Sequence, residues 1–188
     1  MTIFVTGKSG VGKSYLADRL AAQLKYKYVD IDAISKSIYL DSEIVDAVVE
    51  LLGGSILDAD GHIDTKCIGK IIFNKNNVEL KEKFYELTYR YIQQLLKSVS
   101  TENMVMEWSM LPLVDLWRMP GVKVLVTADE QTRVQKILTR DNISLSYLQT
   151  RDAAGVNFDQ YQYDYVFNND YTEESVVSFV NEIKKIIK

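Results

Sequence analysis

Gly7-Lys8-Ser9-Gly10-Val11-Gly12-Lys13-Ser14 is the stretch that decides the fold of this chain. It follows the pattern G-x-x-x-x-G-K-[S/T], in which the glycines allow backbone N–H groups to converge on phosphate oxygens. A short β-rich run precedes it at residues 2–6, and Leu16, Leu20 and Leu24 recur behind it at helical spacing. A strand, a glycine loop and a helix in this order predict a phosphate-binding loop of the P-loop type.

The residue types in this loop indicate its chemistry. Lys13 is expected to reach the β- and γ-phosphates of ATP, and the Ser14 hydroxyl is expected to coordinate Mg²⁺. The helix that follows adds partial positive charge at its N-terminus. The alternative is a glycine-rich turn that only connects the strand to the helix. We predict that ATP is held by Gly7, Lys8, Ser9, Gly10, Val11, Gly12, Lys13 and Ser14.

Beyond the loop, the chain alternates predicted strands and predicted helices. We expect strands at 26–31, 104–108, 122–127 and 163–167, and helices at 32–40, 42–52, 64–98 with a break near 74–77, 144–155 and 173–187. Thr127 and Glu130 form a capping box that predicts a further helix to Arg140. In the second part of the 64–98 segment, one helical stripe carries Leu80, Phe84, Leu87, Tyr91 and Leu95.

This alternation predicts the fold class. The runs at 104–108 and 122–127 are almost continuously apolar, which is typical of parallel strands covered on both faces. We therefore expect an α/β protein, a three-layer α/β/α P-loop kinase fold with a parallel five-stranded sheet. One domain should cover residues 1–188, with a helical substrate-binding insert at about 33–100 and a lid at about 129–156.

Composition excludes several classes of protein. A chain of 188 residues with 47% hydrophobic residues can bury one sizeable core. Its net charge of −4 has the wrong sign for a broad nucleic-acid surface. Cys67 is the only cysteine, no apolar run approaches the roughly 20 residues that span a bilayer, and residues 1–6 run directly into the loop without a leader. We expect a cytoplasmic protein that binds neither nucleic acid nor membrane.

Two carboxylates follow the second predicted strand. Asp30-Ile31-Asp32 ends this strand at the C-terminal edge of the sheet, where open α/β folds bind ligands and where the first strand delivers the phosphate loop. Phosphoryl transfer needs one carboxylate to accept the proton of the attacking hydroxyl and another near Mg²⁺. We predict Asp32 as the catalytic base in contact with the substrate, and Asp30 as a metal ligand. The alternative is that either residue caps the next helix. Glu107, at the end of the third strand, either orients Mg²⁺-bound water or faces solvent.

A group of basic residues follows the fourth predicted strand. Arg133, Lys136 and Arg140 recur at helical spacing, and Arg151 follows on the next helix. This arrangement indicates a lid whose positive charge closes over the transferring phosphates. Arg140 is the predicted catalytic and ATP-binding residue of the lid, and Arg151 is predicted to contact the substrate. The alternative is a solvated helix face.

A phosphate loop alone does not define the reaction, because GTPases, ATP-driven motors and kinases share it. No guanine-reading Asn-Lys-x-Asp follows a predicted strand. A length of 188 residues suits a single-domain kinase better than a large ATPase. We therefore expect a kinase that phosphorylates a small hydroxyl compound.

The order of these features resembles the dephospho-CoA kinase family over nearly the whole chain. Gly7 to Ser14 matches its phosphate loop, and Tyr28 to Asp32 is similar to its strand ending in the Asp taken as catalytic base. Lys136 to Asp141, with Arg151 behind it, resembles the family's lid, and Asp164 to Asn169 resembles its segment near the adenine site. The resemblance implies ATP-dependent phosphorylation of the ribose 3′-hydroxyl of dephospho-CoA in coenzyme A synthesis, with Asn169 as an ATP-binding residue.

The chain departs from that family on the substrate side. Thr88-Tyr89 stands where the family has His-Pro, Ser109-Met110-Leu111 where it has Pro-Leu-Leu, Leu113 where it commonly has Glu, and Gly155 where a Gln often follows the lid Arg. Two alternatives therefore stay open. One is a P-loop kinase of another nucleoside, nucleotide or small metabolite. The other is a non-catalytic, ATP-dependent binding or regulatory protein.

Overall fold

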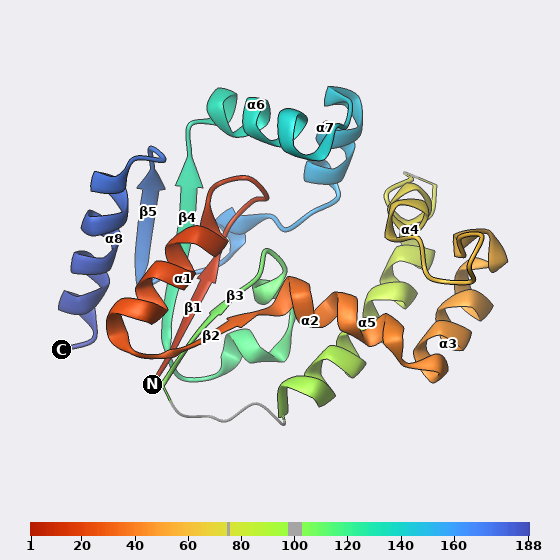
Figure 1. Cartoon of the computed structure of the whole chain (residues 1–188), viewed down its shortest axis with the longest axis horizontal. Coiled ribbons are helices and arrows are strands. Elements are labelled where there is room, and N and C mark those ends of the chain that lie inside the picture. Colours follow the sequence, from red (N-terminus) through yellow and green to blue (C-terminus); the bar gives the residue numbers. More distant parts are fainter. Residues whose placement is uncertain (75, 98–102) are drawn as a thin grey trace. The chain divides into compact units, whose positions relative to one another are not determined.

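The predicted parallel sheet of five strands is present in the computed structural model, which describes residues 1–74, 76–97 and 103–188. The strands run parallel in the order β2-β3-β1-β4-β5, so their C-terminal ends meet at one edge of the sheet (Figure 1). This is the α/β fold that the alternation of strands and helices predicts. The strands are β1 (Thr2–Thr6), β2 (Lys27–Asp30), β3 (Met104–Glu107), β4 (Val122–Ala128) and β5 (Tyr165–Asn169).

The chain divides into two units, which we describe separately. The first consists of Met1–Ile31 with Thr101–Lys188 and contains the sheet. The second is Asp32–Ser100 and is mainly helical. The expectation of one domain with a helical insert at about 33–100 and a lid at about 129–156 stays a prediction.

β1 is buried along its whole length, as a central strand of a parallel sheet requires. Ile3 and Val5 belong to the main core of the first unit. Phe4 meets Trp117 edge-on, with ring centroids 6.2 Å apart. Because successive side chains of a strand point to opposite faces, β1 anchors the packing on both sides of the sheet.

Two long helices cover one face of the sheet. α1 (Lys13–Leu24) and α8 (Glu173–Ile186) lie side by side there (Figure 1). The side chains between these helices and the strands are at most 8% exposed, and burial of their apolar surface stabilises the unit. They include Ile3, Val5, Leu16, Leu20, Val105, Val124, Val126, Phe167, Phe179, Val180 and Ile183.

α6 (Glu130–Asp141) follows β4 and begins with a different cap from the one predicted. The capping box was wrong because Thr127 still belongs to β4, and its hydroxyl donates to the Phe167 carbonyl at 3.3 Å. The N-cap is Asp129, whose carboxylate accepts the N–H of Thr132 at 2.9 Å. Pairing with β5 extends β4 past the predicted helix start.

The remaining elements of the first unit are short. α7 (Leu145–Ala153) begins behind Ser144, the N-cap, as the sequence predicts. α6 and α7 lie beyond the C-terminal ends of the strands (Figure 1). Among the described residues of this unit there are also three 3-10 turns, namely η3 (Leu111–Leu113), η4 (Asp115–Arg118) and η5 (Phe158–Gln160).

The second unit contains four α-helices and two 3-10 turns among its described residues. α3 and α5 pack against each other, and the predicted break separates α4 from α5. Residue 75, inside that break, lies outside the described residues. The elements are α2 (Ile31–Ser37, which begins one residue before the unit), η1 (Ile38–Leu40), α3 (Ser42–Leu52), η2 (Gly54–Ile56), α4 (Thr65–Ile72) and α5 (Val78–Lys97).

The buried face of α5 differs from the predicted stripe. Leu95 is 43% exposed, whereas Leu96 is 5% exposed. The buried line runs instead through Phe84, Thr88, Ile92 and Leu96. Thr88 is tolerated inside because its hydroxyl donates to the Phe84 carbonyl one turn back, at 2.8 Å.

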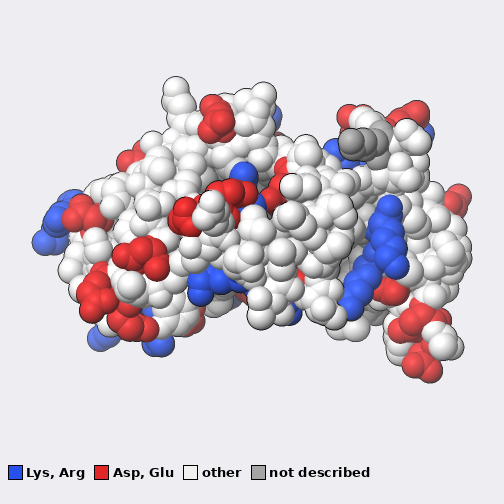
Figure 2. All heavy atoms as spheres, turned by 90° about the horizontal axis from the view of Figure 1, so that it is seen from above, with Lys and Arg blue, Asp and Glu red and all other residues white. Residues whose placement is uncertain are grey.

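The surface shows mixed charge. On the face drawn in Figure 2, small groups of Lys and Arg alternate with Asp and Glu, and no broad basic area forms on that face. Within the described residues, no helix combines the length and the apolar character that crossing a membrane would require.

A substitution at Phe179 tests whether this face of α8 packs in the core. Its fully buried ring packs on Phe167, with centroids 5.0 Å apart. We expect Phe179→Ala to lower the free energy of unfolding by about 3–5 kcal/mol, measured by urea denaturation, because buried contacts are replaced by a cavity. Val177→Ala is the control, since that side chain on the same helix is 60% exposed. It should change the free energy by less than about 0.5 kcal/mol. Equal losses in both variants would contradict this packing.

Candidate active site

The glycine loop joins β1 to α1 at the C-terminal edge of the sheet. Gly10 and Gly12 have φ of 84° and 88°, a left-handed conformation that residues with a Cβ rarely adopt. A Cβ on Gly12 would stand 2.4 Å from Asn169 Nδ2, and one on Gly10 would stand 2.5 Å from the Ile137 side chain. Both the backbone conformation and the close packing on β5 and α6 therefore require glycine at these positions.

The two lysines of the loop lie in different settings. Lys13 is the first residue of α1, is 6% exposed, and its Nζ donates to the Lys8 carbonyl at 3.3 Å. Its ammonium group is therefore folded back over the loop, where a polyphosphate would meet it. The Lys8 side chain is half exposed, and its Nζ lies 3.9 Å from a carboxylate oxygen of Glu130. An exposed ion pair of this kind contributes little to the stability of the fold, so the Lys8 charge stays available to a ligand at the edge of the loop.

An oxygen-rich group forms where the loop meets β2 and β3. The Ser14 hydroxyl donates to Oε1 of Glu107 at 2.8 Å. Glu107 is paired in register with Asp30 on the neighbouring strand, and carboxylate oxygens of the two lie within 4.8 Å of each other. Glu107 is 1% exposed, so the alternative that it faces solvent is wrong. Its signal in the sequence was an acidic residue that ends a buried apolar strand.

The charge and chemistry of this group suit a magnesium ion. Hydroxyl and carboxylate oxygens are the ligands that Mg²⁺ prefers. Burial raises the pKa of the neighbouring Tyr28 phenol well above its usual range, and the charges of Glu107 and Asp30 raise it further. The two carboxylates thus add to the effect of burial, and a divalent cation would neutralise their charge.

Asp32 lies two residues beyond the end of β2. Because α2 begins at Ile31, Asp32 is inside the first turn of that helix and is not its N-cap, whereas Asp30 directly precedes the helix. The Asp32 side chain is exposed, and its backbone carbonyl accepts the Ser35 hydroxyl at 2.8 Å. It is the first residue of the second unit, and its role as a base stays a prediction from its place in the chain.

Arg133 does not form part of an exposed basic lid face. It is 1% exposed, and its guanidinium group donates to Glu130, to Asp152 and, at 3.0 Å, to the Ser9 carbonyl. Burial alone would lower the pKa of Arg133, but the hydrogen bonds to Glu130 and Asp152 outweigh it and raise the pKa. Arg133 therefore ties α6 and α7 to the loop.

Arg140 and Arg151 share one carboxylate. Nε of Arg140 donates to Asp141 at 2.6 Å, and Nη1 of Arg151 lies 3.7 Å from the same carboxylate group. The hydrogen bond from Arg140 is the main reason that the pKa of Asp141 is lowered. Nη2 of Arg140 reaches to 3.5 Å from Oγ of Ser9. In the described part of the chain, Nη2 of Arg151 is buried and makes no hydrogen bond. The structure thus brings both predicted lid arginines together, and one of them to the loop.

Asn169 ends β5 and is 4% exposed. Its amide Nδ2 donates to the Val11 carbonyl at 2.8 Å, and its Oδ1 accepts the N–H of Tyr171 at 3.0 Å. The side chain therefore contacts the loop backbone directly. No sequence pattern connected Tyr171 with the site.

A cavity of about 520 Å³ opens beside the loop in the first unit. Apolar side chains of Val11, Leu125 and Phe158 line it together with the charged groups of Arg133 and Asp152. Its mixed lining and its size suit an organic ligand with polar substituents.

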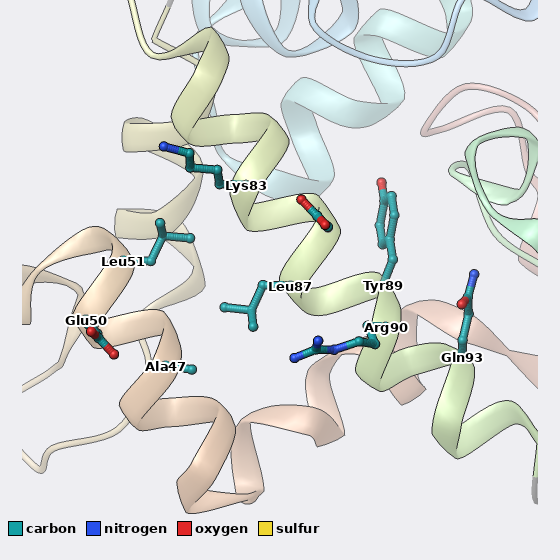
Figure 3. A pocket seen from close by; sticks show the side chains of 9 residues that line it. Ala47, Glu50, Leu51, Lys83, Leu87, Tyr89, Arg90 and Gln93 are labelled. Atoms are coloured by element: carbon teal, nitrogen blue, oxygen red, sulfur yellow. The ribbon is translucent and has the colours of Figure 1, made fainter.

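The second unit has a groove of its own between α3 and α5, of about 790 Å³. Figure 3 shows Leu51 and Leu87 facing each other across it, with Glu50, Lys83 and Arg90 around them. Apolar walls with charged groups around them suit a ligand that has both an apolar part and charged substituents.

Comparison with known proteins places this site in a family. The sequence model of the dephospho-CoA kinase family matches residues 1–174. A dephospho-CoA kinase of Leptospira interrogans (serogroup Icterohaemorrhagiae serovar copenhageni) is 30% identical over 145 residues, which cover 75% of this chain and 70% of the relative.

Solved structures share the fold. A protein from Thermus thermophilus superposes with a TM-score of 0.79 at 18% identity, covering 100% of this chain and 98% of that one. A dephospho-CoA kinase from Campylobacter jejuni gives a TM-score of 0.56 at 20% identity, covering 100% and 97%. The family match spans the loop, the edge carboxylates and both lid arginines, so this chain belongs to the dephospho-CoA kinase family and is an ATP-dependent kinase.

Proposed function

We propose that the chain transfers the γ-phosphoryl group of ATP to the ribose 3′-hydroxyl of dephospho-CoA. Family membership supports the substrates. The observation that carries the proposal is the arrangement around the loop, because Ser14 donates to the buried Glu107 while Arg140 reaches to 3.5 Å from Ser9. A hydroxyl that can bind a metal and a cationic group beside one phosphate loop are the groups that phosphoryl transfer requires.

The donor phosphates would be held by the backbone N–H groups of residues 7–14 and by the ammonium group of Lys13. Arg140 would leave Asp141 and close over the transferring group, because a phosphate carries more negative charge than one carboxylate. Arg151, with its Nη2 buried and making no hydrogen bond in the described structure, would bind an anionic group of the acceptor. Asn169 would contribute to ATP binding by holding the loop backbone through its bond to the Val11 carbonyl.

Ser14 and Asp30 would hold Mg²⁺, and Glu107 would accept the hydrogen bond of the Ser14 hydroxyl and complete the oxygen environment. The metal would neutralise phosphate charge that develops during transfer. Asp32 would accept the proton of the attacking hydroxyl. A reducing, cytoplasmic setting is part of the proposal, because Cys67 is the only cysteine of the chain.

The acceptor is tested by product mass. Purified protein with ATP and Mg²⁺ should add one phosphate to dephospho-CoA. A panel of nucleosides, nucleotides and shikimate-sized hydroxyl compounds serves as comparison. Turnover with one of these and none with dephospho-CoA would replace the proposed acceptor while leaving the kinase chemistry in place.

Asp32→Asn tests the base. We expect turnover to fall on the order of 10²-fold or more, because the amide cannot accept the proton, while the Kd of ADP stays unchanged. Asp41→Asn is the control, since Asp41 is an exposed N-cap in the same unit and Asn caps equally well. Single-turnover kinetics of phosphoryl transfer gives the rate directly. A wild-type rate in Asp32→Asn would show that another group takes the proton.

Glu107→Gln tests the metal site. The amide keeps an acceptor for Ser14 but removes the charge, so the Mg²⁺ concentration for half-maximal activity should rise about tenfold or more. The Kd of ADP without metal should not change. Glu173→Gln is the matched control, because Glu173 accepts the Tyr15 hydroxyl at the same 2.8 Å but on the surface. An unchanged Mg²⁺ requirement in Glu107→Gln would remove Glu107 from the metal site.

A further inference from the structure

Four consecutive carbonyl groups of the glycine loop are each held by a different side chain. The Lys8 carbonyl accepts from Lys13 at 3.3 Å, and the Ser9 carbonyl accepts from Arg133 at 3.0 Å. The next two bonds come from the segment at the end of β5. The Gly10 carbonyl accepts the Tyr171 hydroxyl at 3.0 Å, and the Val11 carbonyl accepts the Asn169 amide at 2.8 Å.

These four bonds determine where the loop amides point. In a trans peptide unit the C=O of one residue and the N–H of the next point in opposite directions. Each carbonyl turned toward a side-chain donor therefore turns the following N–H the other way. The side chains that donate to the carbonyls of residues 8–11 thus orient the N–H groups of residues 9–12, which are the groups that a phosphate loop offers to its ligand.

Tyr171 holds an unusual position in this set. Its φ is 67°, a left-handed conformation that costs free energy for a bulky residue and persists only where surrounding contacts impose it. Its N–H donates to Oδ1 of Asn169, and its hydroxyl reaches Gly10, so the turn after β5 contacts the loop at two successive carbonyls. The ammonium group of Lys136 lies 4.5 Å from its ring centre.

The glycine loop depends on contacts from side chains of other segments to keep its conformation. Glycine loses more conformational freedom on ordering than any other residue, and residues 7, 10 and 12 are all glycine. A loop whose amides are already oriented binds its ligand more tightly, because less freedom is lost at the moment of binding. Arg133 and Lys136 also come from α6, the helix that carries Arg140, so α6 contacts the loop directly through Arg133 and indirectly through Lys136 on Tyr171.

We propose that Tyr171 is a positioning residue for the phosphate donor, which acts with Arg133 and Asn169 to hold the glycine loop with its amides directed at the β-phosphate. Tyr171 touches the Gly10 carbonyl and acts through the loop backbone. The proposal rests on the use of ATP as donor, but it is independent of which compound accepts the phosphoryl group.

The experiment compares two tyrosine-to-phenylalanine variants by calorimetric titration with ADP. Tyr171→Phe removes one hydrogen bond to a loop carbonyl and leaves the ring in place. Tyr163→Phe is the matched control, because the Tyr163 hydroxyl also donates to a backbone carbonyl, that of Phe158 at 2.9 Å, which is not part of the loop. Melting temperatures of both variants without nucleotide measure the purely structural cost.

We expect Tyr171→Phe to raise the Kd of ADP roughly fivefold, the equivalent of one net hydrogen bond, while Tyr163→Phe leaves it unchanged. Both variants should lose similar amounts of thermal stability. With the active enzyme, the KM of ATP should rise in Tyr171→Phe and the KM of the acceptor should not.

A wild-type Kd of ADP in Tyr171→Phe would overturn the proposal and leave Tyr171 a purely structural residue. Equal weakening in both variants would also overturn it, because the effect would then follow general stability. Failure of dephospho-CoA as acceptor would appear in the product assay alone, so the two hypotheses fail separately.

Discussion

The orientation of the glycine loop between β1 and α1 is the constraint on which the candidate site depends. A loop with glycine at 7, 10 and 12 has no side chains of its own to maintain its conformation at those positions. It is held from outside, by Lys13 behind it, by Arg133 on α6, and by the turn that follows β5. Parallel strands make this possible, because they bring the ends of β1, β4 and β5 to one edge.

The strand order also gives the two sides of the loop opposite chemistry. On one side, β3 and β2 contribute Glu107 and Asp30, next to the hydroxyl of Ser14. On the other side, β4 leads into α6, which supplies Arg133 and Arg140. The carboxylates would thus bind a metal ion on one side of the loop, and the guanidinium groups would bind phosphate oxygens on the other side. Transfer between anionic groups requires both kinds of positive charge.

None of the departures from the family pattern falls on the glycine loop, and two of them line cavities. Gly155 lines the cavity beside the loop, and Tyr89 lines the groove between α3 and α5. Thr88, in place of a family His, is buried and bonded to its own helix. The glycine loop therefore keeps the pattern G-x-x-x-x-G-K-S of the family, whereas the departures lie in other parts of the chain.

The sequence alone determined the parallel α/β fold and the phosphate loop, because glycine spacing and continuous apolar runs are local patterns that allow few other conformations. It also predicted the edge carboxylates and the arginines of α6 and α7 as site residues, since these follow strands and helices at fixed offsets, and their roles stay predictions. Only the tertiary structure decided that Arg133 is buried, that Thr88 faces inward on α5, that Glu107 bonds to Ser14, and that Tyr171 holds Gly10. The bond from Tyr171 to Gly10 joins residues that are 161 positions apart in the sequence, and a local sequence pattern cannot predict contacts between residues so far apart.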